Sequence, residues 1–220
     1  MARAFAEIAF TPTVQSIQKT FGSDQLHSSL LTNKAEPRNR ITEREAEFIA
    51  KRDGFYQSTV SESGWPYVQF RGGPAGFIHI LDEQRIAYAD FSGNRQYLSV
   101  GNLTSNDRIA IIMMDYPNRR RLKLWGRVRI ITTDEDPDFV ARLLVDDYPA
   151  QPERAIVITV EAYDWNCPQH IPQRLTLDEL DQYLAPIRAE IERLTAENKA
   201  LKTASTTAIE IEAVGNLPPG

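Results

Sequence analysis

The sequence predicts a mainly β fold with flanking helices, built on a closed barrel of antiparallel strands and followed by a long C-terminal helix. Between residues 64 and 131, short runs rich in β-branched and aromatic residues are separated by Gly, Asp-Glu and Pro-Asn turn signals. This alternation is typical of all-β architectures. From Leu177 to Lys202, leucines and isoleucines recur at spacings of three, four and seven, which indicates an amphipathic helix.

The strands are expected where apolar runs lie between turns. The short connections favour antiparallel pairing, and we expect five or six strands to close the barrel. The last run, with the sequence AIVITVEA, has the highest β-propensity in the chain and should complete the sheet. The runs are Phe55–Ser61, Trp65–Arg71, Gly76–Leu81, Arg85–Ala89, Arg108–Asp115, Leu122–Ile131 and Arg154–Ala162.

Helix signals flank these strands. Thr11 followed by Pro12 is typical of a helix start, and Gly22 is a suitable end. Thr42 and Glu45 form a capping-box pattern for a helix that reaches about Arg52. We expect a loop over Ser23–Arg40, a short helix over Leu98–Leu103 and another over Asp138–Asp146.

The C-terminal segment predicts a second unit. We expect residues 1–176 to form the barrel domain with an N-terminal helical wrap, and residues 177–220 to form a helix with a loose tail. Pro186 predicts either a kink or a later start for the helix. The pattern favours an amphipathic helix docked on its own domain or on a partner subunit, because a coiled coil needs more heptads.

The composition excludes several classes of protein. A net charge of −5 and a pI near 5.3 argue against a general nucleic-acid binder. A single cysteine, Cys167, excludes an internal disulfide, and three dispersed histidines predict no metal site. No apolar run of 18 residues occurs, so we expect a cytoplasmic protein that does not enter the membrane.

The polar residues at strand ends are the best candidates for a site. The sequence contains no GxSxG, Walker or GxGxxG motif, and Cys167 beside Pro168 fits a structural thiol better than a nucleophile. Arg71 ends one run, the tripeptide 94–96 (Asn94, Arg95 and Gln96) precedes a short helix, and Arg121 and Lys123 enter another run. Arginine and a helix N-terminus both suit a phosphate group, whereas an isolated loop arginine would be solvated.

These residues carry a resemblance to a known family. The span from about Phe48 to Arg174 resembles the pyridoxamine 5′-phosphate oxidase-like family, and in particular its predicted flavin-nucleotide-binding branch. The resemblance implies a six-stranded antiparallel split β-barrel that binds FMN. It depends on Phe70-Arg71, on Asp90-Phe91 with Gly93–Tyr97, on Asn102, on Arg121–Gly126 and on the segment WNCPQHIPQR from Trp165 to Arg174.

The resemblance also implies a set of FMN-binding residues. The phosphate would contact Arg71 and the tripeptide 94–96, the polar rim of the isoalloxazine would lie near Arg121 and Lys123, and Trp165 would cover the ring unless it is a core residue. No catalytic side chain is assigned, and no metal is expected. The implied set is Phe70, Arg71, Asp90, Phe91, Asn94, Arg95, Gln96, Arg121, Lys123, Trp165, His170 and Arg174.

Two departures from the family pattern limit the function that it implies. Gln96 stands where pyridoxamine-phosphate oxidases usually have a lysine, and the C-terminal R-L-x-P ending is absent. These departures favour FMN binding over oxidation of vitamin B6. The expected activity is an FMN-dependent oxidation or reduction of an unidentified small molecule, with a nicotinamide nucleotide as a possible electron donor. The alternatives are a flavin-binding module for sensing or storage, or a binder of another cofactor such as deazaflavin or haem. The resemblance further implies a homodimer.

Overall fold

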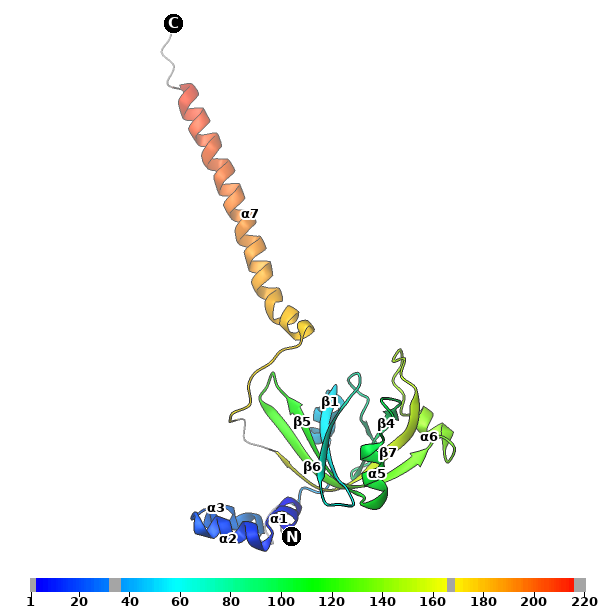
Figure 1. The fold of residues 1–220 in the computed structure, drawn as a ribbon. Helices are drawn as coiled ribbons and strands as arrows, with labels where there is room; N and C mark the ends of the chain where they lie inside the picture. The colour runs from blue at the N-terminus through cyan, green and yellow to red at the C-terminus, as the bar shows by residue number, and fades with distance from the viewer. Residues whose placement is uncertain (1–2, 32–36, 166–168, 216–220) are drawn as a thin grey trace. The chain divides into compact units, whose positions relative to one another are not determined.

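The structure, a computed structural model, describes residues 3–31, 37–165 and 169–215, with side chains up to Lys202 in the last helix. The chain forms two units, residues 1–172 and residues 173–220. The first unit contains an antiparallel sheet that curls around a single main core, and the second contains one long helix (Figure 1). The predicted class, mainly β with flanking helices and a long C-terminal helix, is confirmed.

The sheet contains seven strands in the order β2-β1-β5-β6-β7-β4-β3, and every neighbouring pair is antiparallel. The expected count of six strands is wrong, because all seven apolar runs contain a strand, including the two-residue β3, in which His79 and Ile80 lie opposite Ala87 and Ile86. The sheet order ends at β2 on one side and at β3 on the other. The strands are β1 (Gly54–Val60), β2 (Pro66–Gly72), β3 (His79–Ile80), β4 (Arg85–Phe91), β5 (Arg108–Asp115), β6 (Arg120–Thr132) and β7 (Pro152–Trp165).

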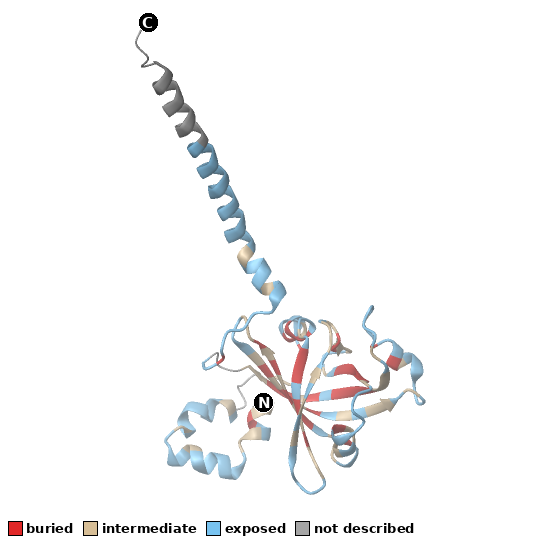
Figure 2. Ribbon diagram, turned by 45° about the horizontal axis from the view of Figure 1, so that its top comes forward, coloured by how far each residue is buried: buried red, intermediate tan, exposed pale blue. Residues whose placement is uncertain are grey.

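Alternation along the strands separates an inner from an outer face. In β5 buried residues alternate with less buried ones, and its inner residues include Ile109, Ile111 and Met113. Many of the buried residues lie along the strands of the curled sheet, where the ribbon is red in Figure 2. β4 is buried along most of its length. Burial of this continuous apolar face is the main source of stability for the barrel.

Six α-helices and one 3₁₀ helix accompany the sheet in the described part of the first unit. The capping box is confirmed: Glu45 accepts hydrogen bonds from the backbone N–H and the hydroxyl of Thr42. Thr11 caps its helix as expected. The helices are α1 (Ala4–Ala9), α2 (Pro12–Thr20), α3 (Asp24–His27), η1 (Ser28–Leu31), α4 (Glu43–Ala50), α5 (Leu98–Ser105) and α6 (Pro137–Ala141).

Two local expectations are corrected, and a later start of the last helix is excluded. The segment 23–40 contains α3 and η1 where a loop was expected. The helix expected over Asp138–Asp146 begins at Pro137, with Asp136 as its cap, and already ends at Ala141. The last helix, α7 (Leu177–Gly215), begins before Pro186 and continues through it. Within the described residues, none of the helices is long and apolar enough to cross a membrane.

Candidate functional site

A cavity of about 220 Å³ lies at one end of the barrel, where β2, β4, the loop after β4 and the first turn of α5 meet. β2 contributes three side chains at every second position, which places them on one face of the strand. Residues from four elements therefore converge on one small polar pocket, which we call the strand-end pocket. Its lining consists of Tyr67, Gln69, Arg71, Asp90, Phe91, Gly93, Asn94, Arg95, Gln96, Tyr97, Leu98, Ser99, Val100 and Glu153.

The first turn of α5 is open at its N-terminus. Its N-cap residue, Tyr97, has a left-handed backbone with φ of 53° and makes no side-chain cap hydrogen bond. Arg95 is also left-handed, with φ of 60°. The left-handed backbone is strained at both residues, whereas glycine would adopt it without strain. Strained residues of this kind are frequent at functional sites. The N–H groups of an uncapped first turn, together with the helix dipole, favour an anion.

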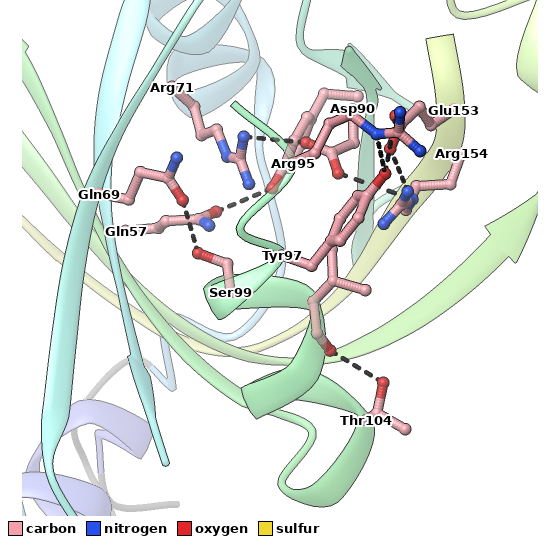
Figure 3. Close-up of polar contacts among 12 residues, drawn as sticks. Gln57, Gln69, Arg71, Asp90, Arg95, Tyr97, Ser99, Thr104, Glu153 and Arg154 are labelled. Atoms are coloured by element: carbon pink, nitrogen blue, oxygen red, sulfur yellow. Dashed lines mark hydrogen bonds and ion pairs between the residues drawn. The ribbon is translucent and has the colours of Figure 1, made fainter. Parts of the chain in front are cut away.

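Arg71, Asp90 and Arg154 form a charged cluster at the edge of the strand-end pocket (Figure 3). The Nη1 of Arg71 lies 3.0 Å from the Oδ1 of Asp90, and the Nε of Arg154 lies 3.8 Å from the Oδ2. The register of β4 and β7 pairs Asp90 with Arg154 directly, beside a bulge after Asp90. The carboxylate thus holds two guanidinium groups from different strands in fixed positions.

The cluster contains hydrogen-bonding atoms that remain unsatisfied. Among the described residues, neither the Nε of Arg71 nor the Oδ1 of Asp90 has a hydrogen-bond partner, although both atoms are buried. The 3.0 Å contact between the Nη1 of Arg71 and the Oδ1 of Asp90 is an ion pair, but its geometry is not that of a hydrogen bond. A buried donor without a partner costs free energy, so the guanidinium of Arg71 is suited to receive an anionic ligand.

The pKa of Asp90 responds to this environment. Burial of the carboxyl raises its pKa above the ordinary value, although the guanidinium groups of Arg71 and Arg154 act in the opposite direction. Behind it, burial also raises the pKa of the Tyr88 hydroxyl far above its usual range, and this hydroxyl donates a 2.8 Å hydrogen bond to the Oε1 of Gln57. The Tyr88 hydroxyl near Asp90 therefore stays protonated in a buried polar layer.

The loop residues are joined to the rest of the pocket by hydrogen bonds. The Nε of Arg95 donates to the hydroxyl of Tyr97, and that hydroxyl lies 3.3 Å from the Oε1 of Glu153. The Ser99 hydroxyl donates to the Oε1 of Gln69 at 2.8 Å, which ties α5 to β2. The hydrogen bond to Tyr97 raises the pKa of the exposed Arg95 guanidinium, so this side chain remains cationic.

The structure brings together half of the site residues predicted from the sequence. These residues line one cavity although they come from β2, from β4 and from the loop after it. The other lining residues were outside the predicted set, and they include Gln69, Ser99 and Glu153. Arg154 was also missed, because only the pairing of β4 with β7 places it beside Asp90. The predicted residues in the pocket are Arg71, Asp90, Phe91, Asn94, Arg95 and Gln96.

The other predicted residues lie elsewhere. Phe70 is on the opposite face of β2 from Arg71 and packs against Tyr56, with ring centroids 5.3 Å apart. Lys123 pairs with Asp164 at 3.4 Å, and its Nζ lies 4.9 Å from the centre of the Phe5 ring.

Arg121 lies opposite Met114 in the β5–β6 ladder. His170 and Arg174 are exposed, and Arg174 belongs to the second unit. The predictions for residues 166–168, including Cys167, lie outside the described residues.

Trp165 has a structural environment in this chain. Its Nε1 donates a 2.6 Å hydrogen bond to the Oε1 of the buried Glu45. Its ring meets that of Phe48 edge-on, with centroids 4.7 Å apart, and the guanidinium of Arg44 lies 4.6 Å from its centre. The indole thus joins the end of β7 to α4, and it does not line the strand-end pocket.

Several solved structures are similar to this chain. No curated protein matches the sequence. Three of the similar crystal structures are a HupZ protein from Group A Streptococcus, a putative pyridoxamine 5′-phosphate oxidase from Lactobacillus delbrueckii and an FMN-binding protein from Syntrophomonas wolfei. Their identities to this chain are 16%, 19% and 11%, and their TM-scores are 0.47, 0.44 and 0.42. In the same order, the matches cover 61%, 57% and 69% of this chain and 99%, 94% and 97% of the three proteins.

The family itself is identified by sequence. The family model for pyridoxamine 5′-phosphate oxidase matches residues 41–167, which is more than half of the 220 residues. This range contains all seven strands of the sheet and every residue that lines the strand-end pocket. The chain therefore belongs to the pyridoxamine 5′-phosphate oxidase family.

Proposed function

We propose that this protein binds FMN and that the strand-end pocket holds the phosphate of the cofactor. One observation carries the proposal: the uncapped N-terminus of α5 and the unsatisfied Nε of Arg71 border the same cavity. Phosphate accepts several hydrogen bonds at once, so it can satisfy backbone N–H groups and a guanidinium together. The amides of Asn94 and Gln96 can add neutral contacts.

The charges around the pocket fit a phosphate monoester. Three arginines, at positions 71, 95 and 154, face two carboxylates, Asp90 and Glu153. The excess is one positive charge, and the raised pKa of Asp90 lowers the cost of placing an anion beside it. The volume of about 220 Å³ suits a phosphate and part of its ribityl chain, whereas complete cofactor sites are usually larger. The isoalloxazine ring would therefore need further surface.

We propose that a second copy of the chain supplies this surface. The outer face of β1 and β2 carries Val68, Phe70 and Tyr56, which are 62%, 55% and 40% exposed. The register places Tyr56 between Phe70 and Ile112, so the apolar face continues onto β5. An exposed apolar sheet face of this kind fits a two-fold contact between identical subunits. In such a dimer Trp165, His170 or Arg174 of the second copy could complete the site.

Flavin occupancy tests whether the site is shared. Val68→Glu should lower the occupancy, although Val68 lies on the opposite face of β2 from the strand-end pocket. Ser63→Glu, in the turn before β2, adds the same charge outside the apolar face and is the matched control. Equal occupancy in the two variants would contradict a shared site.

Bound FMN would supply hydride and single-electron chemistry, and the protein would bind and orient it. The proposed activity is an oxidation or reduction of a small molecule, with a nicotinamide nucleotide as electron donor. Arg121 and Lys123 stay candidates for the polar rim of the ring, where a cation would stabilise the anionic reduced form. No catalytic side chain is assigned, and oxidation of vitamin B6 is not part of the proposal, because Gln96 replaces the usual lysine.

The nature of the co-purified ligand is the first test. We expect a yellow protein with flavin absorbance bands, and we expect mass spectrometry of the denatured supernatant to identify FMN. Deazaflavin or haem in the supernatant would contradict the proposal. Anaerobic addition of NADH or NADPH then tests the activity: bleaching of the flavin, followed by recovery with an electron acceptor, is expected. A flavin that no donor reduces would indicate a module for storage or sensing.

A further inference from the structure

The helix α7 contains a continuous heptad pattern. It begins with a capping box, in which the Thr176 hydroxyl and the Glu179 carboxylate each accept a hydrogen bond from the backbone of the other. It then continues through Pro186 as a single helix. Apolar residues alternate at spacings of three and four from Leu177 to Leu201, which spans more than three heptads. Once Asn198 is counted as a core position, the repeat reaches the three to four heptads that a coiled coil requires, so the shortfall expected from the apolar residues alone does not apply.

Leucine and isoleucine fill both core positions of the heptad, except for one asparagine. The first position of each heptad, called a, is held by Leu177, Leu184, Ile191 and Asn198. The fourth position, called d, is held by Leu180, Ile187, Leu194 and Leu201. Apart from the half-buried Leu184, the apolar members are between 39% and 81% exposed, so they form an exposed stripe along the helix.

The C-terminal half of the stripe favours a parallel pair of helices. Ile191 at an a position and Leu194 at the next d position are the combination that prefers two strands. Asn198 lies at the following a position, where a single buried asparagine fixes register and a two-stranded state, since its amide can pair only with its counterpart. A helix docked on an apolar surface of its own domain would leave this amide without such a partner.

The charges beside the stripe fit the same arrangement. In a parallel pair in register, a residue just before an a position faces the residue five places later in the partner helix. Glu197 and Lys202 have this spacing, and they carry opposite charges. The pair would form twice, once on each side of the stripe. Pro186 lies at the third position of its heptad, on the outside, where the loss of its N–H does not remove a core contact.

We propose that α7 pairs with α7 of a second copy of this chain as a parallel, in-register, two-stranded coiled coil. The seam buries the a and d residues from Leu177 to Leu201, with Asn198 against Asn198. This contact is separate from the sheet face of β1 and β2, and it does not depend on flavin binding. It ties the two copies together through their C-terminal units.

Disulfide trapping in the full-length chain tests the proposal. In a Cys167→Ser background, Leu194→Cys places a thiol in the seam, and mild oxidation should convert the chain to a covalent dimer on a denaturing gel. Ala196→Cys, two residues later on the outer side of the helix, is the matched control and should stay monomeric. Adding Ile191→Lys to the Leu194→Cys variant should abolish the cross-link without changing the melting temperature of the barrel.

Each other outcome of this experiment overturns the proposal. An antiparallel pair would bring Leu194 opposite a different residue, so Leu194→Cys would remain unlinked. Docking of α7 on its own barrel or on an unrelated protein would have the same effect. Equal cross-linking of Leu194→Cys and Ala196→Cys would indicate random collision. Persistence of the cross-link in the Ile191→Lys variant would show that the stripe is not the seam.

Discussion

The Nη1 of Arg71, at the end of β2, lies 3.0 Å from the Oδ1 of Asp90, at the end of β4, and Arg154 approaches the same carboxylate from β7. The two strands that carry the first pair are not neighbours in the sheet, so the ion pair spans the opening of the barrel. It keeps the guanidinium of Arg71 at the strand-end pocket while its Nε stays unsatisfied. The pair therefore has both a structural and a ligand-binding consequence.

Arg71→Gln should destabilise the barrel and weaken FMN binding. Loss of one partner leaves the buried carboxylate of Asp90 with Arg154 alone, which should lower the free energy of unfolding by about 3 kcal/mol at neutral pH. Because burial raises the pKa of Asp90, the carboxyl becomes neutral as the pH falls through that raised value. The deficit should shrink accordingly, since a neutral carboxyl needs no partner. Thermal melts between neutral and acidic pH measure it.

The double variant Arg71→Gln/Asp90→Asn separates the two consequences. It removes the uncompensated charge, so it should recover much of the stability that Arg71→Gln loses. It should not recover the affinity for FMN, because the guanidinium is still absent. Recovery of both properties would show that Arg71 acts only on the fold, and recovery of neither would show that Asp90 is not its electrostatic partner.

Arg95→Ala should weaken FMN binding without affecting stability. Arg95 is exposed, and in the described part of the chain its side chain donates a hydrogen bond to the Tyr97 hydroxyl, so its loss should leave the melting temperature unchanged. Loss of a charge-assisted contact to phosphate should raise the dissociation constant of FMN by roughly tenfold or more. Arg108→Ala, an exposed arginine at the start of β5, is the control. Equal affinities in the two variants would remove Arg95 from the site.

Glu45→Gln should destabilise the protein most at neutral pH. Burial opposes the charge of Glu45, but the hydrogen bonds from Thr42 and Trp165 outweigh it and hold the pKa below its ordinary value. A lowered folded pKa means that the stabilisation is present above the unfolded pKa and is lost as pH falls through the folded value. We expect a loss of about 2 kcal/mol at neutral pH, from the cap and the buried charge.

A pH series of chemical denaturation measures this effect. The difference between the wild type and Glu45→Gln should diminish below about pH 4, where carboxyl groups begin to protonate. Glu43→Gln, in the same first turn but exposed, should change the stability by only a few tenths of a kcal/mol, roughly the size of a helix-dipole contact. A pH-independent difference for Glu45→Gln would contradict a structural carboxylate.

Gly126→Ala should destabilise the barrel strongly. A Cβ at this position would lie 2.5 Å from the carbonyl oxygen of Thr159 and 2.7 Å from the Cγ2 of Ile158, beside the bulge in β6. The backbone oxygen cannot move aside as a side chain can, so we expect a loss of about 3 kcal/mol. Gly101→Ala in α5 meets no atom within 4 Å and should be neutral or stabilising. Similar melting temperatures for the two variants would contradict the close packing of β6 on β7.

Much of the fold could be predicted because the apolar runs and the helix-capping patterns in the sequence coincide with strands and helix starts in the structure. Apolar runs between turn signals identify strands directly: Arg108–Asp115 is β5 as predicted, and Arg85–Ala89 lies within β4. Thr42 and Glu45 mark a helix start in sequence and form that capping box in the structure. The sequence did not predict that β3 has only two residues within the apolar segment around it. The number of residues that pair depends on the partner strand, β4, and not on the segment alone.

The site could be predicted only in part, for a physical reason. Residues near one another in sequence, such as Asn94 and Arg95, were found by their local pattern before a short helix. Arg154 follows Asp90 by more than sixty residues, and only the register of β4 and β7 brings them together. The left-handed backbone of Tyr97 carries no sequence signal, because such residues are usually glycine or asparagine.

The affinity of the purified protein for FMN, compared with its affinity for riboflavin, tests the phosphate pocket most directly. The two ligands share the ring and the ribityl chain, and they differ only in the phosphate. Several charge-assisted hydrogen bonds predict that FMN binds at least about 100-fold more tightly than riboflavin at moderate ionic strength. Fluorescence titration of the apoprotein measures both constants. Equal dissociation constants for FMN and riboflavin would contradict a phosphate site at Arg71 and Arg95.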